Sequence, residues 1–254
     1  MYQEFRPEQR LREFVECGWV LPAPSDRATR VLPDGCVDLF VTGRGEILVA
    51  GPATRHYEVS SDTEGVLAGL RLRPGAVGSV LGRPAGELRD ARIPFDSEFG
   101  ADGRRAVEKL FGTPSPRQRT GLLENLLAAY LTNVDPLLDR PIAHAVQILR
   151  RRPDLPVTML AAEVGFSERQ LRRRFDAAVG YGPKRLSRVL RFQRLLELLH
   201  ATDGPPRWAE LAMASGYADQ SHMINECVAL AGVPPTALPA GASVSSNTAE
   251  PRSP

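Results

Sequence analysis

The chain has 254 residues and a formal net charge of +2, with 43% hydrophobic and 24% charged residues. This length predicts one or two domains, and the composition excludes a disordered, collagen-like or disulfide-stapled chain. No run of about 18 apolar residues is present that would span a membrane. The first residues carry charges and a proline where a signal peptide needs an apolar stretch. The three cysteines, Cys17, Cys36 and Cys227, are far apart, which favours a reducing compartment. We therefore expect a cytoplasmic protein.

The first hundred residues predict short strands, because runs of β-branched, aromatic and apolar residues alternate with turn signals. These runs are Phe14–Leu21, Arg30–Leu32, Val37–Thr42, Ile47–Ala50, Tyr57–Ser60 and Val66–Leu72. Strands at this spacing are typical of a small barrel or sandwich. A short helix over Gly75–Leu81 is expected at its edge.

After residue 100 the apolar pattern changes to a helical period, with residues three and four apart. It predicts helices over Arg104–Phe111 and Pro116–Leu131, which either link two domains or pair with a second subunit. We therefore divide the chain into a barrel over residues 1–100, a helical linker or dimerisation region over 101–135, a helical domain over 136–239 and a disordered tail over 240–254.

The small net charge conceals a strong asymmetry along the chain. Residues 150–194 carry 12 basic and 4 acidic side chains, whereas residues 195–239 carry Arg207 alone against five acidic residues. A dense positive segment is a candidate binding surface for a polyanion, and a solvated helix face in an arginine-rich protein is the alternative.

An internal repeat occupies the helical domain. Leu160–Phe166 matches Leu211–Tyr217 at an offset of 51 residues, and Gly180 and Pro183 match Gly232 and Pro235 at an offset of 52. Each copy has a short helix, a glycine-containing turn, a second helix and a Gly-x-x-Pro stop. This order predicts two helix-turn-helix units.

The second helix of the first copy divides into two faces at 100° per residue. Leu171, Phe175 and Val179 form the apolar face, and Arg169, Arg172 and Arg173 form the opposite one. Ser167 is expected to cap its N-terminus. Arginine pairs bidentately with guanine or phosphate, so the face suits the major groove, and a plain basic surface helix is the alternative.

A longer helix over Lys184–Leu199 joins the two copies. Lys184, Arg188 and Arg191 fall on one side of it, where they either contact phosphate or only solubilise the helix. Arg191 has the further option of an internal ion pair.

The second copy has a different outward face. Its second helix is expected over Asp219–Ala231, with Met223 and Cys227 directed inward and with Gln220, Ser221, Asn225 and Val228 outward. Glutamine and asparagine can read adenine. No lysine or arginine lies between Arg207 and Arg252, so little affinity from counterion release is expected.

Two such units joined by one long helix resemble the AraC/XylS family of transcriptional regulators, over about a hundred residues. The resemblance rests on Leu160-Ala161, Gly165-Phe166-Ser167, Leu171, Arg173, Phe175, Gly180, Pro183, Arg191, Leu198-Leu199, Leu211-Ala212, Gly216-Tyr217, Asp219-Gln220-Ser221-His222 and Gly232-Val233-Pro234-Pro235. It implies promoter DNA bound through two successive major grooves. The base-reading positions that it implies are Arg169, Arg172 and Arg173 in the first copy and Gln220, Ser221 and Asn225 in the second. The chain departs from the family pattern at Met223, Asn225, Cys227, Val228 and Leu195.

The N-terminal part resembles a degenerate cupin-like sensor domain found in front of such DNA-binding domains. The matching stretches are Leu32–Leu39, Gly51–Thr54 and Gly69–Gly75. Metal-binding cupins use several histidines, and His56 is the only one before residue 144, so we expect no metal and no cofactor. The candidate ligand-binding residues are Trp19, Asp34, Cys36, Asp38 and Arg71, with Arg73 as a further candidate. An Asp34-Gly35 turn and an Arg71–Asp38 ion pair are the structural alternatives.

The predicted fold is therefore a multidomain chain, with a small cupin-like α+β barrel in front of an all-α double helix-turn-helix. The predicted function is a bacterial, sequence-specific DNA-binding transcriptional regulator. It reads promoter DNA mainly through the first unit, with Ser167 among the DNA-binding residues, and a small molecule at the barrel modulates it. RNA polymerase and a second copy of the chain are the expected protein partners.

Two alternatives are weighed against this function. In one, the second unit has lost DNA contact and binds a protein. The other is an enzyme, which the sequence disfavours because it shows no histidine cluster, nucleophile elbow or phosphate loop.

Overall fold

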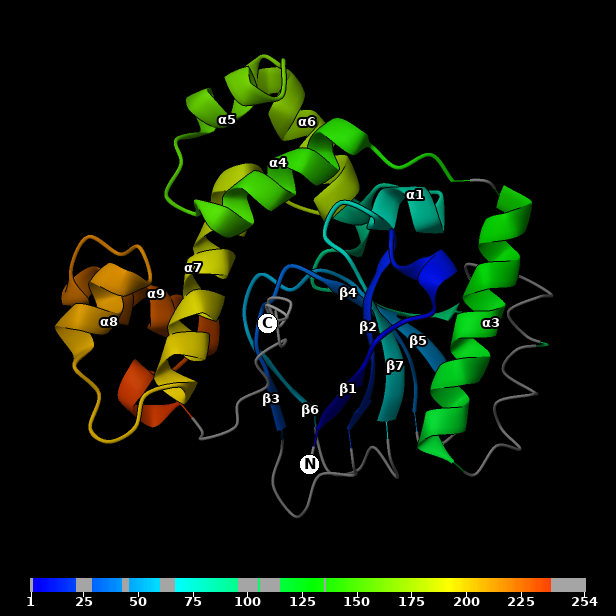
Figure 1. The fold of residues 1–254 in the computed structure, drawn as a ribbon, viewed down its shortest axis with the longest axis horizontal. Coiled ribbons are helices and arrows are strands. Elements are labelled where there is room, and N and C mark those ends of the chain that lie inside the picture. Colours follow the sequence, from blue (N-terminus) through cyan, green and yellow to red (C-terminus); the bar gives the residue numbers. More distant parts are fainter. Residues whose placement is uncertain are drawn as a thin grey trace, which may run out of the picture.

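The computed structural model describes residues 2–21, 29–42, 46–59, 67–95, 105, 115–134 and 136–238. Within these ranges, a mostly β N-terminal unit is followed by a helical unit (Figure 1). No helix in these ranges has the length and apolar character needed to cross a bilayer. The predicted tail, and the predicted helix before residue 112 apart from residue 105, lie outside the described residues.

Six antiparallel strands form the main sheet, in the order β1-β2-β7-β4-β5-β8. Their bounds are Gln3–Phe5 (β1), Val15–Leu21 (β2), Leu67–Leu72 (β7), Val37–Val41 (β4), Ile47–Ala50 (β5) and Arg92–Pro94 (β8). Thr29–Val31 (β3) and Tyr57–Val59 (β6) pair separately as a two-stranded ribbon. This antiparallel unit confirms the predicted fold class, although the sheet and the ribbon are two separate sheets in the described residues and do not close into one hydrogen-bonded barrel.

The predicted strands are all present, and their described ends lie within about one residue of the predicted ones. The sequence reading missed β1 and β8, together with the short 3-10 helices Gln9–Leu11 (η1) and Ala85–Leu88 (η2). Both missed strands are three residues long and lie at sheet edges, and β8 ends in a proline. Alternation of side chains cannot be recognised over so short a stretch.

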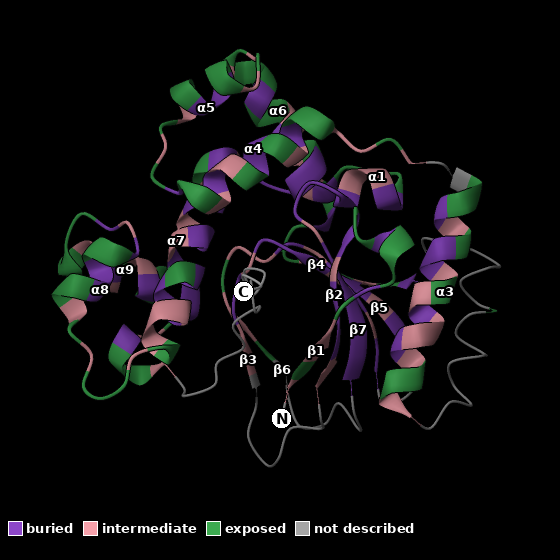
Figure 2. Cartoon of the chain, in the orientation of Figure 1, coloured by how far each residue is buried: buried purple, intermediate pink, exposed green. Residues whose placement is uncertain are grey.

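The long helix α3, Pro116–Val134, packs on the sheet beside β2 and β7. Its buried apolar side chains, Leu123, Leu127, Ala128 and Leu131, belong to the N-terminal core. Buried and exposed segments accordingly alternate along α3 in Figure 2. Gly18 of β2 permits the close approach, because a Cβ there would lie only 2.7 Å from Thr120 Cγ2. The apolar stripe of α3 is thus used inside this chain, and pairing with a second subunit stays a prediction.

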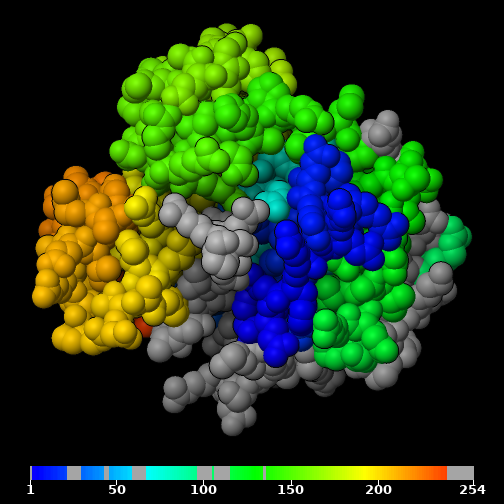
Figure 3. Space-filling model, in the orientation of Figure 1, coloured from blue at the N-terminus to red at the C-terminus, as the bar shows by residue number. Residues whose placement is uncertain are grey.

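The short helix α1, Val77–Leu81, lies at the end of the sheet that faces the helical unit. The helical unit consists of α4 (Arg140–Arg151), α5 (Val157–Glu163), α6 (Glu168–Val179), α7 (Pro183–His200), α8 (Trp208–Ala214), α9 (Gln220–Ala231) and the 3-10 helix η3 (Pro235–Ala237). Its apolar side chains form one core, which includes Phe175 and Phe192. The second helix-turn-helix, orange in Figure 3, lies on the opposite side of the molecule from the green helix α3.

The predicted repeat is reproduced in the backbone. The turns of the two copies contain Gly165 (φ +72°) and Gly216 (φ +87°), and the second helices end at Gly180 (φ +96°) and Gly232 (φ +74°). All four are in the left-handed region that glycine adopts at low cost. The spacing of these glycines therefore determines where the helices of each unit end.

Candidate nucleic-acid interface and ligand cavity

The first helix-turn-helix is formed by α5 and α6. Ser167 caps α6 as predicted, because its Oγ accepts a hydrogen bond from the Gln170 main-chain N–H (3.3 Å). The Gln170 side chain accepts in return from the Ser167 N–H (2.9 Å), which completes a capping box. The start of α6 is therefore fixed by side chains encoded in the turn itself.

The two predicted faces of α6 are present. Leu171, Phe175 and Val179 are fully buried, and Arg169, Arg172 and Arg173 are exposed. Arg172 pairs with Glu168 across one helical turn at 2.8 Å. Such an exposed pair contributes little stability, so a phosphate or a base can replace the carboxylate at small cost.

A basic hollow of about 480 Å³ lies beside this face. Its lining includes four cations from α6 and from the first turns of α7, which are Arg172, Lys184, Arg185 and Arg188. The side chain of Arg188 also pairs with Glu226 at 2.8 Å. The hollow extends the positive surface of α6 toward α7 and fits a sugar-phosphate backbone better than a base edge.

The second helix-turn-helix, α8 and α9, presents a neutral face. Met223 and Cys227 of α9 are fully buried, as predicted, and Gln220, Ser221 and Asn225 are exposed. The N-terminus of α9 is capped by Asp219, whose Oδ1 accepts from the His222 N–H at 2.7 Å. From α8 to the end of the described chain no lysine or arginine occurs.

Apolar side chains lie on the surface of this second unit. Met213 of α8 is 67% exposed and Val228 of α9 is 46% exposed. Arg191 of α7 is directed inward, because it lies 4.0 Å from Glu226 and its guanidinium lies over the Tyr217 ring. The internal ion pair that was one option for Arg191 is thus observed.

A buried ion cluster lies at the centre of the N-terminal unit. Arg71, only 6% exposed, pairs with Asp38 at 3.1 Å, Asp34 at 3.2 Å and Glu4 at 3.5 Å. The Trp19 indole N–H donates to Asp38 Oδ1 at 3.1 Å. Burial raises the pKa of the Asp38 carboxyl above its usual value, and the Arg71 cation opposes this shift.

A small cavity of about 90 Å³ lies between this cluster and the β3–β6 ribbon. It is lined by Tyr2, Trp19, Leu21, Val31, Asp38, Phe40, Thr42, Leu48, Ala50, Tyr57, Leu67, Arg71 and Arg92. The exposed guanidinium of Arg92 stacks on the Tyr57 ring at 3.9 Å. The cavity therefore combines aromatic walls with one buried ion pair and one cation at the rim.

Three of the five predicted ligand residues, Trp19, Asp38 and Arg71, line the cavity. Asp34 joins them only through its ion pair with Arg71, and Cys36 is not part of the cavity lining. Asp34 forms the turn that was its structural alternative, because its Oδ1 accepts from the Cys36 N–H at 2.8 Å. Gly35 in this turn (φ +86°) lies against the helical unit, where a Cβ would be 2.8 Å from Leu186 Cδ1. Sequence reasoning missed the cavity residues Tyr2, Phe40, Tyr57 and Arg92, since only strand pairing brings them together.

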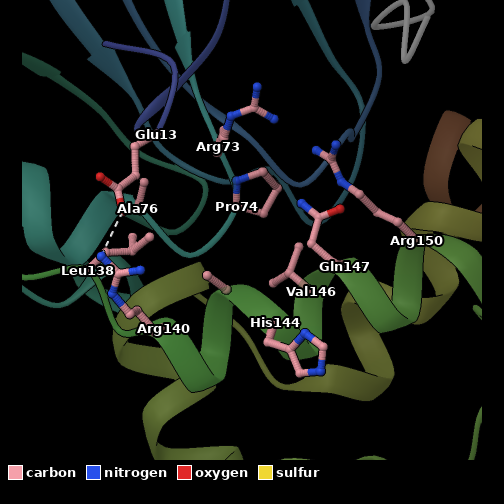
Figure 4. Close-up of a pocket in the computed structure, with 11 residues that line it drawn as sticks. Glu13, Arg73, Pro74, Ala76, Leu138, Arg140, His144, Val146, Gln147 and Arg150 are labelled. Carbon is pink, nitrogen blue, oxygen red and sulfur yellow. Dashed lines mark ion pairs between the residues drawn. The ribbon is translucent and has the colours of Figure 1, made fainter. Parts of the chain in front are cut away.

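A second hollow, of about 290 Å³, lies between the N-terminal unit and α4 (Figure 4). Arg73, the further candidate in the sequence, lines it together with Arg150, His144 and Gln147. Arg73 and Arg150 both bind Glu16, at 2.9 and 3.0 Å. Arg150 of α4 thus joins the helical unit to Glu16 of β2, and Arg73, within the N-terminal unit, shares the same carboxylate. Among the described residues no group of three or more metal-binding side chains is found.

Two domain families match parts of the chain. Residues 3–94 match a domain family of unknown function, DUF6597, and residues 160–240 match a helix-turn-helix domain family. No curated protein sequence matches the chain.

Among solved structures, ToxT from Vibrio cholerae is similar in overall shape. An apo variant of ToxT aligns with a TM-score of 0.48 and 11% identity, over 87% of this chain and 95% of that one. ToxT bound to an unsaturated fatty acid aligns with a TM-score of 0.45 and 12% identity, over 86% and 91%.

Proposed function

Because this chain carries an AraC-type helix-turn-helix domain behind a DUF6597 domain, we propose that it is a transcriptional regulator that binds promoter DNA mainly through the first helix-turn-helix. The observation that carries the proposal is the division of α6 into a fully buried apolar face and an exposed face of Arg169, Arg172 and Arg173. A helix held in this way presents three guanidinium groups to a major groove. The adjacent basic hollow supplies contacts to the phosphates.

The test is DNA binding as a function of salt. Replacing Arg169, Arg172 and Arg173 by alanine is expected to weaken binding to a site selected in vitro by the full chain by at least about a hundredfold, because each good base contact contributes about 1–3 kcal/mol. Arginines that contact phosphate also set the slope of affinity against salt, which falls by about one for each lost contact.

The matched control replaces three exposed arginines of the N-terminal unit, Arg6, Arg10 and Arg117, by alanine. This variant loses the same formal charge, so a general effect of net charge would weaken both variants alike. Unchanged affinity and unchanged salt slope in the α6 variant would refute the assignment of this face.

The N-terminal unit supplies the regulatory site in this proposal. The cavity beside Trp19, Asp38 and Arg71 suits a small, largely apolar molecule with one hydrogen-bond acceptor, because its walls are mostly apolar and aromatic. Arg71 Nη1, which lies 3.5 Å from Glu4, makes an ion pair there but no hydrogen bond and so keeps a donor for such a group. Binding of such a molecule at this site, recruitment of RNA polymerase and pairing of two copies belong to the proposal. The protein then acts in the bacterial cytoplasm as a binding protein and not as an enzyme.

In a second candidate function, the second helix-turn-helix binds a protein partner and not DNA. Its exposed Met213 and Val228, and the absence of cations from α8 to the end of the described chain, favour it. Footprinting of the full chain on the selected DNA site distinguishes these two candidate functions. Protection of two successive major grooves supports DNA binding by both units, and protection of one supports the protein partner.

A further inference from the structure

The N-terminal unit contacts the second helices of both helix-turn-helix units at equivalent places. These helices, α6 and α9, end at Gly180 and Gly232, which match each other in the repeat. A Cβ on Gly180 would lie 2.3 Å from Pro52 Cγ, and a Cβ on Gly232 would lie 2.3 Å from His56 Cε1. One short segment, residues 52–56, therefore touches both helix ends, and we call it the 52–56 connector.

Hydrogen bonds to the last carbonyls of the two helices accompany these contacts. Arg89 Nε donates to the Gly180 carbonyl oxygen at 2.6 Å, and the Arg89 guanidinium also pairs with Asp176. On the other side, the His56 N–H donates to the Leu230 carbonyl oxygen at 2.7 Å. Carbonyls in the last turn of a helix lack partners inside the helix and favour a nearby cation, so these contacts cap both helices from outside.

The two capping points are joined to each other. Asp90, next to Arg89, accepts hydrogen bonds from the Thr54 N–H at 2.6 Å and from the Thr54 hydroxyl at 2.7 Å. The Cα atoms of Pro52 and His56 can be at most about 14 Å apart, since four residues extend no further. The connector therefore limits the distance between the C-terminal ends of α6 and α9.

The connector also adjoins the ligand cavity. Tyr57 directly follows His56, and Arg92 lies two residues after Asp90 in the sequence; both line the cavity, where they stack on each other. In the β3–β6 ribbon, Val31 lines the cavity, while its neighbour Arg30 donates through Nη1 to the Ala231 carbonyl oxygen of α9 at 3.2 Å. Adjacent residues of a strand point to opposite faces, so the ribbon touches the cavity on one side and α9 on the other.

From these contacts we propose that the 52–56 connector, with Arg89 and Arg30, sets the separation of α6 and α9 and transmits changes of the cavity wall to both. This rests on the proposed function, because it assigns regulation to the same cavity. The exposed arginines of α6 and the polar side chains of α9 are free of the connector, so it acts on the spacing of the two faces and not by covering them.

The first test measures spacing in the free protein and needs no DNA. Spin labels are placed at Ala162→Cys on α5 and Met213→Cys on α8, which are exposed and equivalent in the repeat, and the native cysteines are buried. The connector is released by Arg89→Met with Thr54→Val, which remove the Arg89 bonds to α6 and the Thr54 hydroxyl bond to Asp90. Arg83→Met is the control, because Arg83 precedes the 3-10 helix η2 and pairs with Glu87 inside it. Electron–electron double resonance is expected to show a broadened or shifted distance distribution in the released variant only.

The second arm tests the link to the cavity by the substitution Tyr57→Ala. It is expected to shift the distance distribution in the otherwise native chain and to add nothing once the connector is released. An unchanged distribution in the released variant would overturn the spacing role. If Tyr57→Ala shifts the distance distribution by the same amount in the native and in the released chain, the connector does not transmit changes of the cavity wall.

DNA binding supplies the last arm. Release is expected to change affinity for a selected site that spans two grooves by about tenfold, within the range usual for coupled sites, and affinity for a half-site of one groove by less than about twofold. Equal changes at both sites would refute a role in spacing. If the chain binds no DNA, the proposed function fails, whereas the distance measurement still decides the role of the connector.

Discussion

Arg71 is the residue whose removal is expected to affect the N-terminal unit most. It is almost completely buried and binds three carboxylates, those of Asp38, Asp34 and Glu4, within 3.5 Å. The substitution Arg71→Met keeps the unbranched stem of the side chain and leaves these carboxylates without their cation. Breaking a buried ion pair by removing one partner costs about 3–5 kcal/mol, a large part of the roughly 5–15 kcal/mol that stabilises a typical domain.

The dependence on pH follows from the direction of the Asp38 pKa. Burial raises this pKa above its unfolded value, and loss of the opposing Arg71 cation raises it further. An acid with a raised pKa in the folded state favours folding when it is protonated, so its contribution is lost as the pH rises through the folded pKa. The stability difference between the native chain and Arg71→Met is therefore expected to shrink as the pH falls toward the unfolded value of about 4.

Urea unfolding followed by tryptophan fluorescence measures this difference. The chain has two tryptophans, Trp19 beside Asp38 and Trp208 in α8, so a Trp208→Phe background lets Trp19 report on the N-terminal unit alone. The exposed pair of Arg83 and Glu87 provides the control, since Arg83→Met should cost less than about 1 kcal/mol. A loss below about 1 kcal/mol for Arg71→Met, or a loss independent of pH, would refute this reasoning.

Two further outcomes are expected. Ser167→Ala removes the capping box of α6 and should lower the free energy of unfolding of the helical unit by about 1 kcal/mol, measured by thermal or urea unfolding. Ser167→Asp should stay close to the native chain, because aspartate can also cap a helix. If Ser167→Ala has native stability, tertiary packing alone fixes the start of the helix. Gly232→Ala puts a methyl group into the His56 ring and strains a backbone with positive φ, so it should lower the melting temperature. In a double-mutant cycle, His56→Ala should remove the part of that loss caused by the clash and leave the part caused by backbone strain. If the effects of the two substitutions on the melting temperature simply add, the contact between Gly232 and His56 is contradicted.

The helical unit could be predicted closely from the sequence because its signals are local. Ser167 caps the helix that it precedes, and the glycines at 165, 180, 216 and 232 adopt the left-handed conformation that ends helices. Leu171, Phe175 and Val179 recur at a helical period and are buried together. The exposed arginine face of α6 follows from the same period, because a helix that buries one side must expose the other.

The N-terminal site was less predictable, because its parts come from different strands. Tyr2, Phe40, Tyr57 and Arg92 line the cavity with the predicted Trp19, Asp38 and Arg71. The order of the strands, in which β2 and β4 both pair with β7, brings Trp19 and Asp38 together across the sheet. Asp34 and Cys36 belong to a turn that packs against the helical unit and do not line the cavity, although Asp34 also pairs with Arg71.

The sequence by itself determined most of the elements, the repeat, and the arginine face that makes α6 the candidate DNA reader, since caps, turns and periodicity act within a few residues of each other. Tertiary structure alone decided that α3 packs on the sheet, that Arg191 pairs with Glu226, and that Pro52 and His56 touch the ends of α6 and α9. These contacts join residues far apart in the chain, whose partners are set by the packing of one unit on another. The net charge of +2 says nothing about where the charges lie, whereas the helical period of α6 places Arg169, Arg172 and Arg173 on one surface.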